Sequence, residues 1–280
     1  MNNNNKQGFT RSEMLVVIGV VGILAGLLLP ALANPKTKGD RITCLLNLRR
    51  LIQAWELYGQ DNSGRLVMNF QGGSIPNGSQ AAPWALGWLN WTTSKDNTNV
   101  QLLIDDKYSK LAKYTDRNPA LFLCPADRFV SAKQQSAGWT RRTRSLSMNM
   151  GIGDGNAETG PWLLTMYRHI RTTAEFVYPG PSDTFVFLEE NPDSINDPGF
   201  FCPTTRTAWV DQPASYHDAA GAFAFADGHT ELKKWTASLA TPAAQQIHWI
   251  ANVTATAFKP NDADIRWVNY HGGRSSTNAF

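Results

Sequence analysis

Polar residues that could take part in chemistry gather around one short segment. His217 is followed, after nine intervening residues, by Asp227 and Gly228, and His229 comes directly afterwards. Two imidazoles and a carboxylate are ligands that transition metals accept, so these residues could hold a metal ion. Asp-Gly is also a typical pair for a tight hairpin turn. We favour this second interpretation, in which Asp227 and Gly228 make the turn and His217 bonds to nearby backbone.

A loop after residue 190 is rich in side-chain oxygens, from Asp193, Asn196 and Asp197. Calcium prefers such ligands, so these residues could hold a calcium ion; apart from this we expect no cofactor. Glu189 and Glu190 are the types of residue that form paired acids in glycosidases. Adjacent residues of a strand point to opposite faces, however, and these two should not converge. We find no pattern of catalytic residues and expect a protein that is not an enzyme.

The three cysteines are few and odd in number, which argues against a disulfide framework. Cys44 falls in a helical pattern and is expected to be a small core residue. Cys124 and Cys202 each precede a proline and could pair in an oxidising compartment.

Composition limits the class of protein. Lys and Arg number 26 against 23 Asp and Glu among 280 residues, and the net charge of +3 is too balanced for a nucleic-acid binder. Hydrophobic residues make up 42% and charged residues 18%, which is typical of a globular chain. The mean hydropathy of −0.32 excludes a polytopic membrane protein but not a single span.

The N-terminal region should form a long helix. Residues 14–33 carry no charge and would span roughly 30 Å as a helix, which matches the core of a bilayer. We therefore predict a transmembrane helix at 9–33 and an amphipathic continuation at 34–60. The apolar stripe of that continuation follows helical spacing through Leu45, Leu48, Ile52 and Trp55. The turn-forming residues 59–64 should end the helix.

Residues 61–280 are expected to form an α+β globular domain, in which an antiparallel β-sheet packs against the end of the long helix. A hairpin is expected where two apolar stretches flank Asp227 and Gly228. The predicted strands are 121–124, 144–149, 184–188, 221–226 and 230–235, and the predicted helix is 99–114.

The N-terminus resembles the type IV prepilin and type II secretion pseudopilin family. The matching features are Gly8, Phe9, Thr10, Glu13, the apolar run and Pro30. The resemblance implies a leader peptide at 1–8, cleavage between Gly8 and Phe9 by a prepilin peptidase, and methylation of the new amine on Phe9. Arg11 and Ser12 depart from the family, which usually has Leu-Ile before the glutamate.

Glu13 has a physical reason to take part in assembly. A carboxylate at the edge of hydrocarbon is costly unless it is paired, and cleavage would place an ammonium on Phe9. The family pairs this acid with the amine of a neighbouring subunit, so the resemblance gives Glu13 and Pro30 a role in assembly. Gly22 and Gly26 have the small-residue spacing that lets apolar helices approach closely.

His217, Asp227 and Gly228 also match the H-X9-DG signature of a large group of bacterial prepilin-processed proteins. The segments 123–127, 185–197 and 223–235 are similar to that group too. This second resemblance, at 217–228, strengthens the assignment but implies no chemistry.

These features predict a structural subunit of a type II secretion pseudopilus or pilus-like fibre. The chain would cross the bacterial inner membrane once, with a cytoplasmic N-terminus and a periplasmic globular domain, and would reach a fibre or the cell surface after assembly. Its partners would be the prepilin peptidase and methyltransferase, other pseudopilin subunits, inner-membrane secretion components and membrane lipid, but no nucleic acid. The alternative is a membrane-tethered or surface-displayed protein that binds glycans through Trp84, Trp88 and Trp91.

Overall fold

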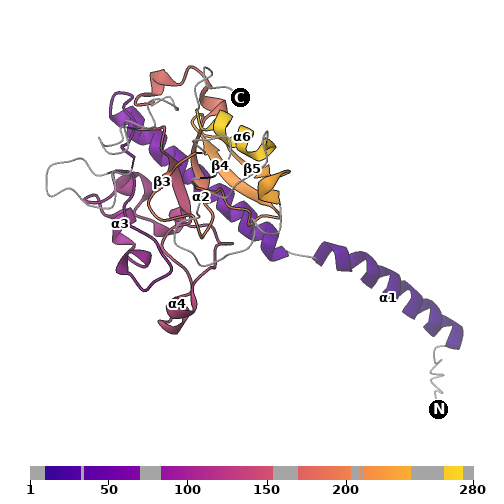
Figure 1. Ribbon diagram of the computed structural model, residues 1–280. Coiled ribbons are helices and arrows are strands. Elements are labelled where there is room, and N and C mark those ends of the chain that lie inside the picture. Colours follow the sequence, from indigo (N-terminus) through magenta and orange to yellow (C-terminus); the bar gives the residue numbers. More distant parts are fainter. Residues whose placement is uncertain are drawn as a thin grey trace, which may run out of the picture. The chain divides into compact units, whose positions relative to one another are not determined.

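The computed structural model describes residues 10–32, 35–69, 83–153, 170–202, 209, 211–240 and 262–273. The chain divides into two compact units, Met1–Gly39 and Asp40–Phe280. Helices and a five-stranded sheet make up the second unit, which confirms the α+β class (Figure 1). The predicted cleavage residues Gly8 and Phe9 lie outside the described residues.

Helix α1 spans Arg11–Leu32 and begins with a capping box. The backbone N–H and the hydroxyl of Thr10 each donate to the Glu13 carboxylate at 2.8 Å, and the Glu13 N–H donates to the Thr10 hydroxyl at 3.3 Å. A Cβ added at Gly22 would meet nothing within 4 Å. The surroundings of Gly26 and Pro30 lie outside the described part.

Membrane crossing was expected at residues 9–33. Among the residues that the structure describes, none of the helices combines the length and the apolarity needed to span a bilayer.

Helix α2 spans Pro35–Asp61, and its core stripe agrees with the sequence pattern. Cys44, Leu48, Ile52 and Trp55 are each at most 2% exposed. The helix gives way to a turn in which Ser63 and Gly64 adopt φ values of 56° and 80°, as the turn-forming residues predicted. Because this stripe packs on the sheet, α2 from Asp40 onward belongs to the same compact unit as the strands.

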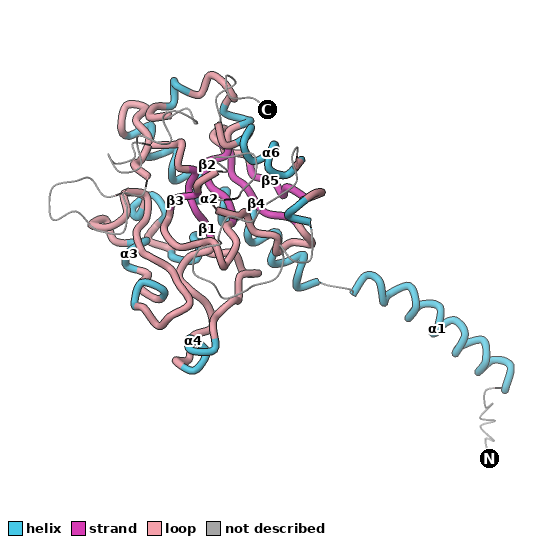
Figure 2. Tube along the Cα trace, viewed as in Figure 1, coloured by secondary structure: helices cyan, strands magenta, loops and turns pink. Residues whose placement is uncertain are grey.

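The sheet has the strand order β3-β1-β2-β4-β5 (Figure 2). The strands are β1 Leu146–Asn149, β2 Phe185–Glu189, β3 Gly199–Phe200, β4 Ala220–Phe225 and β5 Thr230–Lys234. Neighbouring strands are antiparallel, as expected, except that β3 pairs with β1 in parallel. The chain reverses after β2 and lands on the far edge of β1, which sets this parallel pair.

The two faces of the sheet carry two apolar clusters. Alternate residues of a strand point to opposite faces, so Ala222 and Ala224 face α2 while Phe223 and Phe225 face the other side. Helix α6, Ala263–His271, contributes Ile265 to this second cluster. The sheet is therefore covered on both faces.

Two predicted elements were wrong. Residues 119–122 form a 3₁₀ helix, η3, because Pro119 is its first residue and the Asn118 side chain caps it; no strand forms at 121–124. The helix predicted at 99–114 is broken after α3, Gln101–Ile104. The backbone is extended at Asp105, whose carboxylate accepts a hydrogen bond from the Lys107 N–H at 2.9 Å in a local turn.

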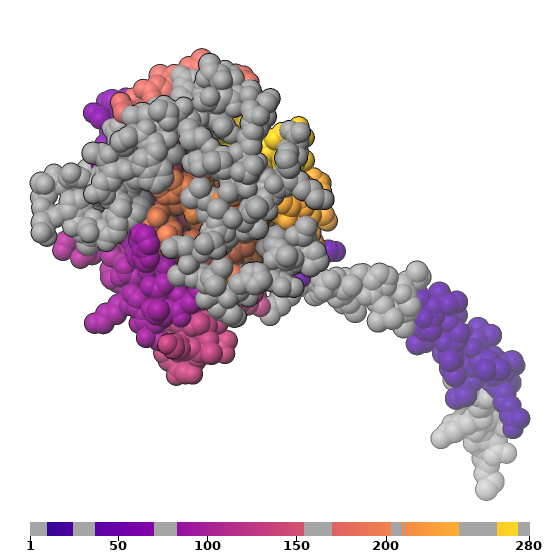
Figure 3. All heavy atoms as spheres, viewed as in Figure 1, coloured from indigo at the N-terminus to yellow at the C-terminus, as the bar shows by residue number. Residues whose placement is uncertain are grey.

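The remaining described helices are short. They are η1 Lys95–Asn97, η2 Ala112–Thr115, η3 Pro119–Phe122, α4 Ala132–Ser136, η4 Thr173–Glu175, η5 Pro181–Asp183 and η6 Ser238–Ala240. Figure 3 shows the surface over α3 and α4 in purple and pink, beside atoms outside the described residues in grey.

Candidate functional site

Four side chains of metal-binding type meet between α2 and the sheet: Cys44, Cys124, Glu189 and His217. One ligand atom from each lies within 4.8 Å of the others. All four residues are buried, with at most 1% of their surface exposed. They come from separate parts of the chain, namely α2, the segment after η3, the end of β2 and the turn before β4. We call this group the dithiol cluster.

Ordinary periodicity brings two of these side chains together. Cys44 lies one helical turn before Leu48 on the core stripe of α2, so it faces the sheet. Glu189 is two residues beyond Phe187 on β2 and therefore shares the face that packs against α2. A carboxylate thus ends a strand whose other residues on that face are apolar.

The contacts within the dithiol cluster are short. The Cys44 Sγ–H donates to Glu189 Oε1 at 2.8 Å, and His217 Nε2 lies 3.0 Å from the same oxygen. Cys124 Sγ is 3.5 Å from His217 Nε2. The other carboxylate oxygen, Glu189 Oε2, accepts from the Ala222 N–H at 2.8 Å. The sheet therefore holds one oxygen of Glu189 and leaves the other facing the cluster.

Burial and pairing oppose each other in the electrostatics of this cluster. Burial would raise the pKa of Glu189, but the hydrogen bond and charge of His217 bring it below its usual range. Burial would lower the pKa of His217, but its contacts with Cys124 and Glu189 raise that pKa to about 10. Burial is also the main cause that raises the pKa of the Cys44 thiol. Without a metal, the cluster is a carboxylate–imidazolium pair beside two thiols.

The dithiol cluster is not arranged as a catalytic triad. In a Cys-His-acid triad the nucleophile and the acid contact opposite nitrogens of the imidazole. Here Cys124 Sγ and Glu189 Oε1 both approach Nε2 of His217. The Nδ1 atom is buried and has no hydrogen-bond partner among the described residues. This geometry suits ligands that converge on one point, and the absence of enzymatic activity stays a prediction.

The hairpin forms where it was predicted, with Gly228 at φ +87°. Asp227 Oδ1 accepts from the His229 N–H at 3.1 Å and lies 2.5 Å from His229 Nδ1. His217 is buried with the cysteines instead, so the idea that His217, Asp227 and His229 share a metal was wrong. The turn interpretation of Asp227 and Gly228 is confirmed, but the His217 side chain bonds to Glu189 rather than to backbone.

The oxygen-rich loop has protein donors on its side chains. Asp193 Oδ1 accepts from Trp91 Nε1 at 2.9 Å. Asn196 Oδ1 accepts from the Asp197 N–H at 2.7 Å, and Asp197 Oδ1 accepts from the Gly199 N–H at 2.8 Å. One side-chain oxygen of each residue thus already accepts a hydrogen bond within the fold, and calcium binding by this loop stays a prediction.

Glu190 enters different surroundings from Glu189, as expected of adjacent strand residues. It accepts from the Ser194 hydroxyl, and burial raises its pKa to about 8. The positive charge of buried Arg144 acts in the opposite direction and lowers the pKa of Glu190.

The tryptophans do not form the predicted stacking surface. Trp84 and Trp91 are buried, at 0% and 8% exposure, and only Trp88 of the three is exposed, at 40%. Cys124 and Cys202 do not pair, because Cys124 lies in the apolar cluster beside α2 and Cys202 lies in the cluster on the other face.

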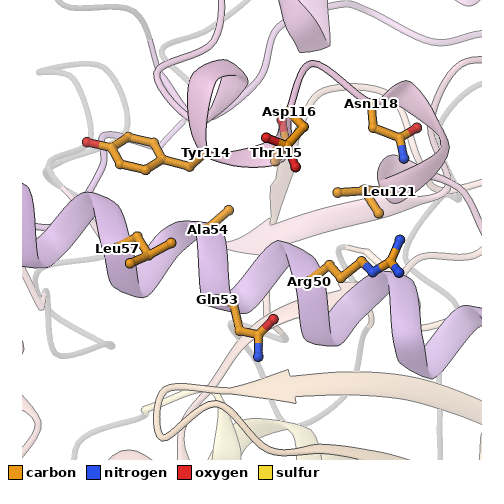
Figure 4. Close-up of a pocket in the computed structure, with 9 residues that line it drawn as sticks. All are labelled: Arg50, Gln53, Ala54, Leu57, Tyr114, Thr115, Asp116, Asn118 and Leu121. Atoms are coloured by element: carbon orange, nitrogen blue, oxygen red, sulfur yellow. The ribbon is translucent and has the colours of Figure 1, made fainter.

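A hollow of about 410 Å³ lies between α2 and the segment of residues 114–121. Figure 4 shows Arg50, Gln53 and Leu57 of α2 along one side and Tyr114 and Asp116 along the other. None of its lining residues belongs to the dithiol cluster, and we assign no chemistry to it.

Comparison with known proteins relates part of the chain to the pseudopilins of type II secretion. The relatives carry the name type II secretion system core protein G. That of Klebsiella michiganensis is 40% identical over 63 residues, which is 22% of this chain and 44% of the relative. That of Aeromonas hydrophila is 36% identical over 84 residues, 30% of this chain and 58% of the relative.

The similarity is partial. The protein of Escherichia coli K12 is 36% identical over 59 residues, 21% of this chain and 41% of the relative. The chain thus spans about half the length of the curated relatives that it matches. No protein-family model matches the chain, and no solved structure matches it significantly. The relatives support a pseudopilin role at the level of the family, over part of the chain only.

Proposed function

We propose that this protein is a pseudopilin-type structural subunit of a type II secretion system or a related pilus-like fibre. The observation that carries the proposal is the identity of 36 to 41% with type II secretion system core protein G over 58 to 84 residues. The glycine, phenylalanine and glutamate at positions 8, 9 and 13 support it from the sequence. In this proposal the subunit works by packing, and its partners are other pseudopilins and secretion components.

The apolar helix gives the proposal a physical basis. From Met14 to Leu24 the large apolar side chains of α1 are each at least 50% exposed. Such a surface is unfavourable in water and calls for lipid or other helices as its surroundings. In the proposal, the inner membrane covers it before assembly, with the globular unit in the periplasm, and α1 of neighbouring copies covers it in the fibre. A prepilin peptidase would cut between Gly8 and Phe9 and methylate Phe9.

Processing tests the proposal at the leader. We expect the protein isolated from cells to begin at Phe9 with a methylated amine, as read by intact-mass and N-terminal peptide mass spectrometry. Gly8→Leu should abolish the cut, because the family's peptidase cleaves after glycine. Gly39→Leu is the matched control, since a Cβ there meets nothing within 4 Å. A native chain that keeps residues 1–8 would contradict the proposal.

Assembly tests the role of Glu13, and the capping box permits a sharper design than alanine alone. Glu13→Gln keeps the cap, because glutamine also serves at this position of a capping box, but it removes the charge. Glu13→Ala removes both. If charge pairing between subunits drives assembly, both variants should lose most of the fibre recovered by shearing and sedimentation. Normal fibre from Glu13→Gln would show that the residue serves only to cap α1.

A further inference from the structure

We propose that Cys44, Cys124, Glu189 and His217 form a buried structural site for Zn²⁺, which fastens α2 to the sheet. The proposal goes beyond the role in a secretion fibre and does not depend on it. It rests on the convergence of four ligand atoms within 4.8 Å of one another in the core of the second unit.

The donor set selects the metal. Two thiolates, one imidazole and one carboxylate make four ligands, which is the number that a closed, tetrahedral zinc site uses. Thiolates disfavour calcium and magnesium, which prefer oxygen ligands. All four residues are at most 1% exposed, so the site leaves no side open to solvent or substrate. The geometry points to a structural ion rather than a catalytic one.

Three of the separations between ligand atoms are close to those of an occupied site, and all of them are within 4.8 Å. Zinc bond lengths of about 2.0 to 2.3 Å place tetrahedral ligand atoms roughly 3.3 to 3.8 Å apart. Cys124 Sγ and His217 Nε2 are already 3.5 Å apart. Glu189 Oε1 lies 2.8 Å from Cys44 Sγ and 3.0 Å from His217 Nε2. Binding would therefore require the Glu189 oxygen to move away from its neighbours by about half an ångström.

Backbone donors support the charged forms that a metal needs. The Ala222 N–H bonds to the outer carboxylate oxygen of Glu189 at 2.8 Å, and the Ala126 N–H bonds to Cys124 Sγ at 3.3 Å. These contacts orient two ligands from outside the cluster, as outer-shell hydrogen bonds do in metal sites. Three negative ligands around Zn²⁺ leave a net charge of −1, which these N–H groups help to stabilise.

Two other arrangements of the same residues make different predictions. In the first, the cluster is metal-free, with a Glu189–His217 ion pair beside two thiols. In the second, Cys44 and Cys124 form a disulfide, which requires an oxidant and an approach of the two sulfurs to about 2.05 Å. Metal content and thiol content separate these two arrangements from the zinc site.

The experiment uses the full-length chain produced in zinc-supplemented medium. We expect about one zinc per chain by elemental mass spectrometry after extensive dialysis. Replacement with Co²⁺ should give the intense near-ultraviolet charge-transfer bands and visible d–d bands of a tetrahedral thiolate site. Cys124→Ser and Glu189→Gln keep the side-chain volume and should each lower zinc affinity by tenfold or more. Cys202→Ser is the matched control, because this buried cysteine belongs to the other apolar cluster and should leave the zinc content unchanged.

Stability gives a second measurement. With free zinc about 100-fold above its dissociation constant, the Tm of the wild-type protein should rise by roughly 5 to 10 °C over the chelated form, and the Tm of the Cys124→Ser variant should rise by at most about half as much. Wild-type protein that binds no zinc and gives no cobalt spectrum would overturn the proposal. So would a single reactive thiol in protein denatured without reductant, since any disulfide among the three cysteines uses Cys44, Cys124 or both. Equal loss of zinc in Cys202→Ser would also overturn it.

Discussion

At the scale of single residues, burial raises the pKa of several acidic side chains. Asp127 is 4% exposed, and burial raises its pKa to about 6, although Arg142 and the Phe129 N–H act in the opposite direction. Burial also raises the pKa of Asp197 to about 6. These carboxyl groups hold a proton more tightly in the folded chain than in the unfolded chain, so they oppose folding once they ionise.

The pH dependence of stability should reveal Asp127. Its folded pKa of about 6 lies above the ordinary value of 3.8, so its contribution to stability is lost as the pH rises from about 4 to about 6. Asp127→Asn keeps an oxygen that accepts from the Phe129 N–H but cannot titrate. We expect the variant to lose less stability than the wild type over this range, by up to about 3 kcal/mol.

Urea unfolding at pH 4, 5, 6 and 7 measures this difference. Asp116→Asn is the control, because Asp116 is exposed and its left-handed backbone, at φ 52°, suits asparagine. Parallel stability curves for wild type and Asp127→Asn would contradict the prediction.

At the scale of elements, the segment from His217 to Gly228 contacts α2 at both of its ends. His217 at one end of β4 meets Cys44, and Gly228 at the other end lies against Glu56, so a Cβ there would approach Glu56 Oε1 at 2.8 Å. Cys44 and Glu56 are about 18 Å apart along the helix, and the six-residue β4 is about 20 Å long. The nine residues inside the motif thus set the length of strand that bridges the two contacts.

Three glycines with positive φ should respond differently to alanine. Gly138, at φ +81°, has open space around it, so Gly138→Ala should cost only the backbone strain of about 1 kcal/mol. Gly228→Ala should lower the stability slightly more, because the new Cβ would also displace the Glu56 side chain, which is flexible enough to move aside. Gly153→Ala should cost most, about 3 kcal/mol or more, because the new Cβ would lie 2.2 Å from the backbone oxygen of Val67.

Thermal and urea denaturation of the three variants tests this order. Equal losses at Gly138 and Gly153 would show that backbone strain, rather than the close approach of Val67, governs both positions.

At the scale of the whole molecule, the second half of the long helical region belongs to the globular unit. The boundary between the two compact units falls between Gly39 and Asp40, inside α2. Cys44, Leu48, Ile52 and Trp55 are part of the larger apolar cluster, together with Phe187 of the sheet. The sheet therefore depends on α2 for the cover of one face.

Fragments of the chain should show this dependence. A fragment of residues 40–280 should unfold cooperatively, with a Tm within a few degrees of the full-length chain. A fragment of residues 61–280 lacks the α2 stripe, so it should lose near-ultraviolet circular dichroism and cooperative unfolding. Cooperative unfolding of the shorter fragment would contradict the role given to α2.

Local sequence determined much of this protein. The helical stripe of α2 was predictable because its residues repeat every three or four positions, and the β4–β5 hairpin was predictable because Asp227 and Gly228 interrupt two strands. The capping box of Thr10 and Glu13 was also within reach, since a threonine three residues before a glutamate is its signature. These signals depend only on neighbours within a few residues.

Tertiary structure decided the dithiol cluster. Cys44 and Glu189 are 145 residues apart, Cys124 and His217 are 93 apart, and Glu189 and His217 are 28 apart. No local spacing links them, because their meeting requires α2 to pack on the face of β2 that carries Glu189. The same apolar cluster buries Trp84. Short-range periodicity sets which face a side chain takes within its own element, and only the packing of elements decides what that face meets.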